Sequence, residues 1–381
     1  MTKPFLALAA SAALAFADAP ASLTVTAVNP LDLARASQTL ELSAAQLAPL
    51  AAKDLSLIHV QDAAGKELIA QAVDTDFDAL HKFDSVIFQS DFAAKETKTF
   101  TVSVGAKQEF TKEQFKAFGR FNRERFDDFA WENDRIAHRI YGKALETWAG
   151  EPLTSSTIDI WSKRTARMVV NDWYLADHYH HDTGEGADFY SAGKSRGCGG
   201  TGIWAADQLW VSKNFTASRV LANGPVRVLF ELDYEAFDAN GAKVSETKRI
   251  ALDAGSQLDH LQSFYKTDAP GTLTCALGIK KVDGASVTFN AANGSLLVWE
   301  KVAKNAGQQG IALLANPKSV GQTEDKLNHL LLTKCGADNS VSYWAGFAWD
   351  KAGVIADAAA WKKYVDDFAA GLTAPIAVSV K

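Results

Sequence analysis

Cysteine is scarce in this sequence, whose 381 residues include only Cys198, Cys275 and Cys335. Three cysteines are too few for the disulfide framework of a small secreted domain, and an odd number leaves at least one thiol unpaired. Cys275 and Cys335 both lie in strand-like stretches and could pair, which would leave Cys198 as the free thiol. Three free, buried thiols are the alternative. Either arrangement excludes a scaffold held together by disulfides.

The sequence also lacks an excess of positive charge and a membrane-spanning apolar run. Its formal net charge is −6 at pH 7, so it has no electrostatic footprint for nucleic acid. No stretch approaches the ~20 apolar residues that a transmembrane helix needs. The apolar run FLALAASAALAFA follows Lys3 and ends in Ala15-Phe16-Ala17, which is typical of a signal peptide and its cleavage site. We therefore expect residues 1–17 to be removed, no membrane contact afterwards, and a secreted or periplasmic protein.

Alternating apolar and polar residues, the pattern of β-strands, dominate the rest of the chain. Up to about residue 105 the strand-like runs are short and separated by turns, and Asp62-Ala63-Ala64-Gly65 is a hairpin signal between two of them. Residues 18–106 are therefore predicted to form a small antiparallel sandwich. No catalytic residue types cluster there, so we expect an accessory domain. A polar, charged stretch over residues 106–126 marks its boundary.

The second predicted domain, residues 107–381, consists mainly of longer strands. Those between about residues 210 and 349 follow one another closely, and Asn240-Gly241 is a strong hairpin signal. Such a series requires a large antiparallel sandwich of two sheets. An amphipathic helix is predicted from an N-cap at Asp357, with an apolar stripe of Trp361, Tyr364, Val365, Phe368 and Leu372 that packs against the fold. The final run PIAVSVK alternates again and should return to a sheet edge.

The stretch from Asn171 to Trp204 concentrates residues that do chemistry. Its charges recur at no period that would give an apolar face, so it is predicted to be neither an amphipathic helix nor a buried strand. We expect a long loop, and loops of this length inside a globular protein are usually functional. The candidate residues in it are His178, His180, His181, Asp177, Asp182, Glu185, Asp188, Tyr190 and Arg196.

A second group of candidates precedes that segment, in DDFAWENDRIAHRIYG, residues 127–142. On a strand, Arg135, Arg139 and Tyr141 share one face, whereas His138 shares the other face with two isoleucines. The arginines would form an anion-binding wall, because a planar guanidinium donates two parallel hydrogen bonds to a carboxylate. The alternative is that both pair with nearby acids on a solvated face. His138 is expected to be a core histidine.

Four segments together resemble a known family: DFAWENDRIAHRIYG, HYHHDTGEGADFYSAGKSRGCGGTGIW, VLANGPVRVLFELDY and RIALDAGSQLDHLQSFY. The family comprises secreted bacterial proteins that accompany enzymes degrading uronic-acid polysaccharides such as pectin, alginate and ulvan. It in turn resembles the galactose-mutarotase-like superfamily, whose fold is a twisted antiparallel supersandwich. The resemblance implies an all-β chain with few helices, in which a small N-terminal sandwich precedes a supersandwich catalytic domain. It also implies a uronic-acid oligosaccharide or polysaccharide as partner.

Such a substrate suggests proton chemistry at C5, the carbon beside the carboxylate. The C5 proton is too weakly acidic to remove unless the carboxylate charge is neutralised. Arg135, Arg139 or Arg196 would neutralise it, a histidine would act as base and a tyrosine as acid, which gives β-elimination by a lyase or dehydratase. The candidates for base and acid are His178, His180, His181, Tyr179 and Tyr190. Further substrate-binding candidates are Trp131, Glu132, Asp134, Glu185, Asp188 and Lys280.

Other functions fit the same residues. The same groups without a leaving group would give an epimerase or mutarotase, and Glu185 with Asp188 could be the acid and base of a glycoside hydrolase. His178, His180 and Asp182 could bind zinc, or nearby carboxylates calcium, although no cofactor is firmly implied. A non-catalytic carbohydrate-binding protein would need aromatic platforms but no cluster of titratable groups. The cluster favours an enzyme.

Overall fold

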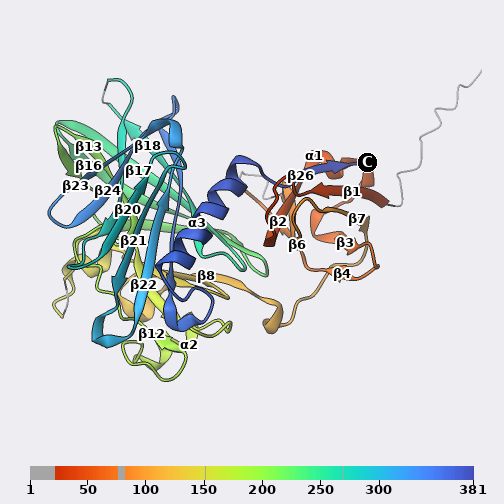
Figure 1. The fold of residues 1–381 in the computed structure, drawn as a ribbon, viewed down its shortest axis with the longest axis horizontal. Helices are drawn as coiled ribbons and strands as arrows, with labels where there is room; N and C mark the ends of the chain where they lie inside the picture. The colour runs from red at the N-terminus through yellow and green to blue at the C-terminus, as the bar shows by residue number, and fades with distance from the viewer. Residues whose placement is uncertain (1–21, 76–81, 151, 269) are drawn as a thin grey trace, which may run out of the picture.

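The computed structural model describes residues 22–75, 82–150, 152–268 and 270–381 of the chain. A smaller and a larger β-rich body lie next to each other along the long axis of the molecule (Figure 1). The predicted signal peptide, residues 1–17, lies outside the described residues. Within the described ranges, no helix combines the length and the apolar character that crossing a membrane requires.

The smaller body is an antiparallel sandwich of two sheets. One sheet has the strand order β26-β1-β7-β3-β4 and the other the order β2-β6-β5. Alternate residues of each strand point inward, so that Val25, Val60, Phe88 and Phe100 form the core. The strands are β1 (Ser22–Val28), β2 (Arg35–Ser43), β3 (Ile58–Asp62), β4 (Glu67–Leu68), β5 (Ala70–Val73), β6 (Ser85–Phe92) and β7 (Thr97–Val104).

The last strand of the chain, β26 (Ala377–Val380), belongs to this smaller body. It pairs antiparallel with β1, with Val25 opposite Val380 and Val28 opposite Ala377. The alternating final run therefore does form an edge strand, as predicted. The predicted second domain, residues 107–381, is corrected at its end, because its last strand completes the N-terminal sandwich.

The larger body has one eight-stranded sheet on one side and two five-stranded sheets on the other, and all its strand pairs are antiparallel. In order across the sheet, the large one contains β15 (Phe215–Asn223), β16 (Arg227–Ala239), β17 (Ala242–Asp253), β18 (Leu258–Thr267), β25 (Ser340–Trp349), β22 (Gln308–Leu314), β21 (Ser295–Lys301) and β20 (Ser286–Asn290). The first small sheet contains β14 (Gln208–Trp210), β13 (Cys198–Ala205), β19 (Thr274–Lys280), β24 (Asn328–Lys334) and β23 (Val320–Glu324). The second contains β12 (Gly186–Ala187), β11 (Asp159–Lys163), β10 (Ala137–Ile140), β9 (Asp128–Asn133) and β8 (Ala117–Asn122). The predicted all-β fold with few helices, a small sandwich followed by a large one, is confirmed.

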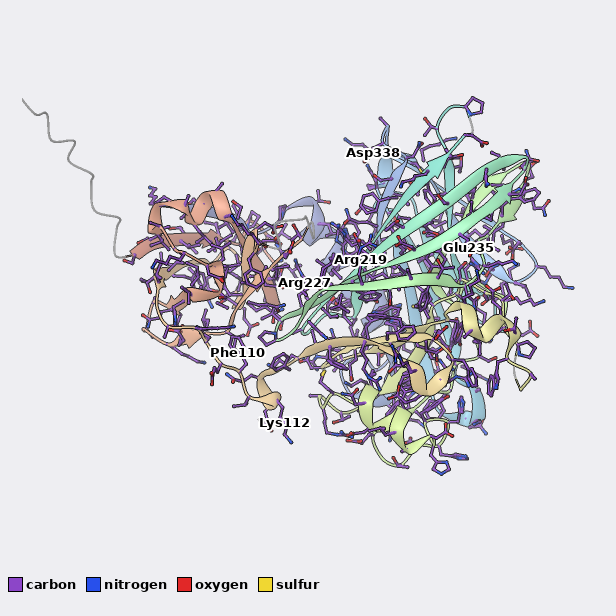
Figure 2. The ribbon with its side chains drawn as sticks, turned by 180° about the vertical axis from the view of Figure 1, so that it is seen from behind. Phe110, Lys112, Arg219, Arg227, Glu235 and Asp338 are labelled. Atoms are coloured by element: carbon purple, nitrogen blue, oxygen red, sulfur yellow. The ribbon has the colours of Figure 1, made fainter. Side chains whose placement is uncertain are left out.

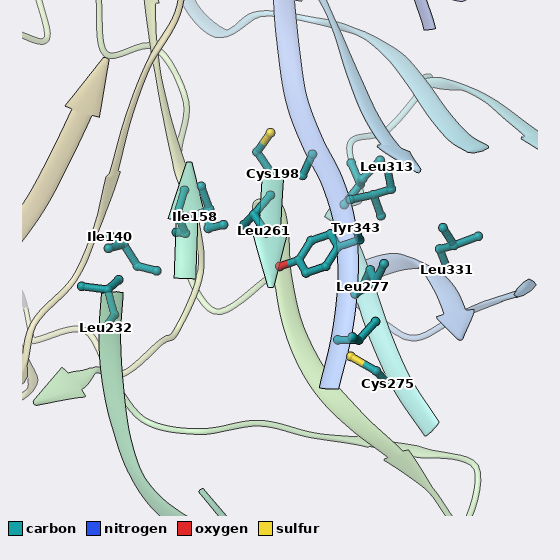
Figure 3. Close-up of a cluster of buried hydrophobic side chains, with 14 of the residues drawn as sticks. Ile140, Ile158, Cys198, Leu232, Leu261, Cys275, Leu277, Leu313, Leu331 and Tyr343 are labelled. Atoms are coloured by element: carbon teal, nitrogen blue, oxygen red, sulfur yellow. The ribbon is translucent and has the colours of Figure 1, made fainter. Parts of the chain in front are cut away.

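A single hydrophobic core fills the space between the two layers of the larger body. Phe129 of β9 stacks on Phe230 of β16, with ring centroids 4.1 Å apart. Leu261, Leu277 and Tyr343 come from three further strands of this core and lie close together in Figure 3. Inner faces of both layers are therefore committed to packing, so any open site has to lie on an outer face.

All three cysteines are buried and free. Of the two arrangements considered for the thiols, the one with three unpaired cysteines is observed, and Cys275 does not pair with Cys335. Burial raises the pKa of Cys275 well above its ordinary value and that of Cys335 to about 11. Both therefore remain protonated and behave as small apolar core residues.

Helix α3 (Ala358–Thr373) covers part of the outer face of the large sheet. Its N-cap is Asp357, whose carboxylate accepts a hydrogen bond of 2.8 Å from Ala360 N, as predicted. Trp361 and Val365 of the expected apolar stripe are buried against β21 and β22. Leu372, at the end of the stripe, is exposed instead. The helix thus covers only part of that face.

Two kinds of contact hold the smaller body against the larger one. The amide of Gln71 accepts hydrogen bonds of 2.8 Å from both Val226 N and Arg227 N and donates one of 3.0 Å to Arg227 O. Arg227 also reaches Glu41 of β2 at 3.2 Å, and it lies where the large sheet approaches the small body (Figure 2). An apolar cluster that includes Val73 and Leu229 supports the same junction.

The segment from Asn171 to Trp204 is less irregular than predicted. It begins inside helix α2 (Val170–Ala176), contains the short strand β12 and ends in β13. Trp173 and Tyr174 of α2 pack on Trp161 of β11. The segment therefore covers the outer face of the sheet β8 to β12 as a packed layer, and only its middle part is a loop.

Candidate functional site

Strand β10 presents Arg139 on the outer face of its sheet, with the expected alternation. Ile140, next to it, points to the opposite face and is buried in the core. Arg135 is not on the strand: it lies in the β9–β10 turn, where the N–H groups of Arg135 and Ile136 donate to Asn133 Oδ1 at 2.8 and 2.9 Å. The predicted wall of Arg135 and Arg139 therefore does not form.

The guanidinium of Arg139 lies among three carboxyl groups. Its Nε donates to Asp159 Oδ2 at 2.9 Å and its Nη2 to Asp188 Oδ2 at 2.7 Å, while its Nη1 is 3.7 Å from Asp128 Oδ2. Asp159 is the direct partner of Arg139 across the β10–β11 pair. All four side chains are almost completely buried. We call Arg139, Asp128, Asp159 and Asp188 the Arg139 centre.

Aromatic residues surround this centre. The hydroxyl of Tyr141 donates to Asp159 Oδ2 at 2.5 Å, and that of Tyr174 donates to Asp128 Oδ2 at 3.1 Å. The Arg139 guanidinium lies 5.4 Å from the ring centroid of Tyr179 and 5.7 Å from that of Trp161, within the range of cation–π attraction. A low-dielectric shell of this kind strengthens the electrostatic interactions inside it.

Burial leaves the Arg139 centre with fewer ionised carboxyl groups than its composition suggests. It raises the pKa of Asp188 to about 8 and that of Asp128 to about 7, because neither carboxylate is solvated and Arg139 only partly offsets the loss. At neutral pH the centre therefore retains a proton that an ordinary aspartate has already lost. Groups with such perturbed pKa values are concentrated at functional sites.

Three polar atoms of the centre have unused hydrogen-bonding capacity. Asp128 Oδ1, Asp188 Oδ1 and Arg139 Nη1 are buried and have no hydrogen-bond partner among the described residues. Buried polar groups normally have partners, since an unmade hydrogen bond costs roughly 1–3 kcal/mol. These unpaired atoms therefore mark the centre as a place where the usual satisfaction of buried polar groups is incomplete.

His180 lies at the accessible edge of the Arg139 centre. Its Nδ1 is 3.4 Å from Asp188 Oδ2, its ring contacts that of Tyr179 with 4.6 Å between centroids, and its side chain is 54% exposed. Partial burial lowers the pKa of His180, and the nearby Arg139 contributes in the same direction. The imidazole is therefore neutral at neutral pH and able to accept a proton from outside.

An aromatic pair lies beside this edge. Phe126 stacks on Trp148 with 4.4 Å between ring centroids, and Phe126 is 40% exposed. The guanidinium of Arg125 lies over Trp148 at 5.5 Å, and its Nε is 3.6 Å from Asp128 Oδ2. Flat aromatic faces and adjacent donors are suited to sugar rings. The pair thus extends the Arg139 centre to the surface.

The backbone beside Phe126 depends on a glycine. Phe126 and Asp127 both have left-handed backbone angles, with φ of 34° and 65°, a conformation that is uncommon outside glycine. A Cβ on Gly142 would lie 2.2 Å from Asp127 O, so only glycine fits against this turn. The chain thereby holds Arg125 and Phe126 at the edge of the centre.

Two other predicted bases, His178 and His181, lie away from the Arg139 centre. Their rings lie edge to face on the surface with 6.4 Å between centroids, and both are exposed. Asp182 pairs with Arg164. No group of three or more His, Cys, Asp and Glu side chains in the described ranges could hold a metal ion, so His178, His180 and Asp182 do not form the ligand set considered for zinc. Nor does the calcium set of nearby carboxylates assemble.

Three predicted ligand-binding residues have structural roles instead. Trp131 is buried and its indole donates to Asp259 Oδ1 at 2.7 Å. Glu132 is buried, with Lys163 Nζ at 2.8 Å. Arg196 is buried, and its guanidinium donates to the hydroxyl groups of Ser155 and Ser156 and to Thr201 O. None of the three is accessible to a sugar.

The remaining candidates are spread over the molecule. Glu185 pairs with Arg167 on the surface. Tyr190 is buried, and Lys280 Nζ lies 5.4 Å from its ring centroid. Asp134 accepts a hydrogen bond of 2.6 Å from Gly255 N, near the junction of the two bodies. Of the predicted site residues, the structure therefore brings together Arg139, Asp188, Tyr179 and His180.

Sequence reasoning missed Asp128, Asp159 and Tyr174. Each comes from a different element, so the alternation within one strand could not connect them with Arg139. The Arg139–Asp159 pair depends on the register between β10 and β11. For Asp128 and Asp159, the signal in the sequence was an acidic residue in each of the two strands beside β10. This signal can be used only when the strand order is known.

The fold and the centre together define a mainly β, two-body protein with a buried acid–base cluster. Residues 27–378 match the family described as "Domain of unknown function (DUF4861)", and the chain belongs to this family. "Uncharacterized protein P7" of Formosa agariphila is 32% identical over 378 residues, covering 94% of this chain and 93% of that protein.

A solved structure shares the fold. An alpha-mannosidase from Enterococcus faecalis V583 superposes with a TM-score of 0.51 at 11% sequence identity, covering 96% of this chain and 46% of that chain. This chain thus spans less than half the length of the mannosidase. At this identity the likeness concerns the fold alone.

Proposed function

We propose that this protein is a secreted carbohydrate-active enzyme that acts on uronic-acid-containing oligosaccharides by β-elimination at the Arg139 centre. The observation that carries the proposal is a proton-retaining carboxyl group, Asp188, next to an accessible neutral imidazole, His180. Acid–base catalysis needs a proton donor and a proton acceptor with pKa values near the working pH. A sugar substrate also agrees with the mannosidase whose fold the chain shares, and the uronic acid with the sequence resemblance.

We assign each step of the elimination to a group of the centre. The positive charge of Arg139, with the protonated Asp188 beside His180, would disperse the charge of a uronate carboxylate bound at the accessible His180 edge. His180 would take the C5 proton, the C5 electron pair would become the C4–C5 double bond, and the C4–O bond would break. Burial raises the pKa of Tyr179, so its hydroxyl keeps a proton to give to the departing oxygen.

The arrangement of the carboxyl groups favours elimination over hydrolysis. Glycoside hydrolases usually place two carboxyl groups on opposite sides of the bond, roughly 5–10 Å apart. Here Asp128, Asp159 and Asp188 all approach a single guanidinium, at 3.7, 2.9 and 2.7 Å. A sugar ring cannot enter between groups that share one cation. The other member of the hydrolase pair considered, Glu185, pairs with Arg167 on the surface.

A comparison of two neighbouring histidines tests the proposal. The purified protein is incubated with oligosaccharides from pectin, alginate, ulvan and glucuronan, and the ultraviolet absorbance of the C4–C5 double bond is followed. We expect His180→Ala to lower kcat by about 10²–10⁴-fold, with little change for His181→Ala, which removes an exposed ring outside the centre. Absence of unsaturated product from all four substrates, or equal rates for both variants, contradicts the proposal.

A further inference from the structure

A cleft of about 880 Å³ lies between the two bodies, away from the Arg139 centre. Its walls come from β2 of the smaller body, the outer face of β16, β17, β18 and β25, and helix α3. The volume is within the range of roughly 300–1,000 Å³ that small-molecule sites occupy. The Arg139 centre is on the outer face of the opposite layer, since Phe129 and Phe230 stack between the two. The cleft is therefore a separate place on the molecule.

Four arginines line this cleft, and two of them have no acidic partner. Arg227 pairs with Asp253 and Glu41, and Arg249 pairs with Glu231. Arg35, in contrast, donates only to the carbonyl oxygen of Ala374, at 3.0 Å. Its guanidinium has no carboxylate within ion-pair distance in the part of the chain that the structure describes.

Arg135 is the second arginine without an acidic partner. It is exposed in the β9–β10 turn, and no hydrogen bond or ion pair of its guanidinium occurs among the described residues. It lies near Tyr364 of α3: burial raises the pKa of that phenol, and the Arg135 charge opposes the rise. A planar guanidinium free on both edges can bind a carboxylate through two parallel hydrogen bonds.

An aromatic platform occupies the wall formed by β18 and β25. His260 and Trp344 are directly opposite each other across this strand pair, and their rings stack with 4.9 Å between centroids at an interplanar angle of 17°. His260 Nε2 contacts Ser342 Oγ at 2.8 Å, which fixes the imidazole plane. Both rings are partly exposed and line the cleft. Such a flat surface suits the apolar face of a sugar ring.

We propose that the cleft is a second binding site of this protein, for a uronate residue of an acidic oligosaccharide. Arg135 pairs with the sugar carboxylate, Arg35 adds positive charge from the smaller body, and the Trp344–His260 stack holds the ring. A ligand with both a carboxylate and a sugar ring that has an apolar face uses all these groups together. The site needs no chemistry at the Arg139 centre, so the inference goes beyond the proposed enzymatic function.

Calorimetric titration with the full chain tests the site. The probes are trisaccharides of galacturonate, glucuronate and mannuronate, with the methyl ester of trigalacturonate as the uncharged control. We expect at least one acid to bind, with an affinity that falls as salt rises. Arg135→Gln should weaken it about tenfold or more, since it removes a charge-assisted pair of hydrogen bonds. Lys266→Gln, which removes an exposed charge from β18 outside the cleft lining, should bind like the wild type.

The result separates the cleft from the Arg139 centre. His180→Ala should retain the binding. Trp344→Leu should weaken the binding of both the acid and the ester. Unchanged thermal unfolding of Arg135→Gln would exclude misfolding as the cause of its weaker binding. The proposal is overturned if no acid binds, if the ester binds as tightly as the acid, or if Arg135→Gln binds like the wild type. If the wild type binds the acid but turns over none of the substrates, the enzymatic function is refuted. If Arg135→Gln then loses the binding, the cleft site is supported independently.

Discussion

Asp188 is the residue on which the chemistry of the Arg139 centre depends. One guanidinium cannot balance three buried carboxylates, and burial, with the nearby Asp159 in the same direction, raises the pKa of Asp188 to about 8. Because Asp188 is within 4 Å of Arg139 and of His180, its proton can move when either neighbour meets a charged ligand. The centre therefore responds to a substrate carboxylate as a coupled set of groups.

The same proton makes stability depend on pH. The folded chain keeps the Asp188 proton up to about pH 8, whereas the unfolded chain releases it near pH 4. Between these values the folded state binds more protons, so the free energy of unfolding falls as pH rises. We expect Asp188→Asn to flatten this fall and to raise the urea midpoint at pH 8 relative to the wild type, by an amount worth on the order of a few kcal/mol.

Urea unfolding at pH 5, 6, 7 and 8 measures this effect. Asp207→Asn is the matched control, because Asp207 is exposed and its left-handed backbone, with φ of 55°, also suits asparagine. The control should follow the pH profile of the wild type. If the free energy of unfolding falls with pH equally in Asp188→Asn and in the wild type, the proton is not held at Asp188.

At the scale of single residues, the sequence predicts where side chains point only within one strand. Alternation placed Arg139 and Tyr141 correctly on one side of β10, because side-chain direction follows from strand geometry. It failed at Arg135, since Asn133 folds the backbone into a turn by accepting from two N–H groups. The three carboxyl groups meet through strand order and through the covering segment, and neither follows from local periodicity.

At the scale of elements, helix α2 is held in place by a buried ion pair. Glu132 of β9 accepts hydrogen bonds from Val169 N and Val170 N at 2.8 and 2.7 Å and from Lys163 Nζ at 2.8 Å. A carboxylate at the first turn of a helix satisfies free N–H groups and interacts favourably with the helix dipole. The helix in turn positions Tyr174 against Asp128. Glu132 thus supports the Arg139 centre without belonging to it.

Replacing this carboxylate should be costly. Glu132→Gln leaves the fully buried Lys163 ammonium without its counter-ion, and breaking a buried pair in this way costs about 3–5 kcal/mol. Glu124→Gln is the control, because it removes the same charge from a partly exposed pair with Arg120, where about 0–1 kcal/mol is expected. Chemical denaturation of both variants compares the two costs. Equal losses would show that Glu132 does not anchor the helix.

The covering segment shows why element assignment from sequence was incomplete. Its acidic and histidine residues suppress any amphipathic pattern, so a long loop was predicted. In the structure, aromatic residues determine the first part of the segment: Trp173, Tyr174 and Tyr179 pack on Trp161 and hold it against the sheet. Packing of a few large rings overrides weak local preferences, which single-sequence periodicity does not detect.

At the scale of the whole molecule, the chain closes on itself. After α3 the chain leaves the larger body, and its last strand, β26, pairs with the first strand, β1, in the sheet of the smaller body (Figure 1). The alternation of the last residues predicted a sheet edge but not which sheet, because partner choice depends on distant residues. This closure fixes the smaller body against the larger one, and with it the wall of the cleft that carries Arg35.

The closure predicts that one face of β26 determines the stability of the smaller body. Val378 is half-buried and packs on the core of that body, whereas the adjacent Ser379 is exposed. Val378→Asp buries an unpaired charge and should destabilise the sandwich by about 2 kcal/mol or more, while Ser379→Asp adds the same charge on the solvent side and should stay within about 0.5 kcal/mol. Hydrogen exchange of the β1 amides reports the difference, since β1 becomes an edge strand when β26 detaches.

For Val378→Asp we expect fast exchange in β1, with protection kept in β16 and β17. Unchanged protection in β1 would mean that the smaller body is stable without its last strand.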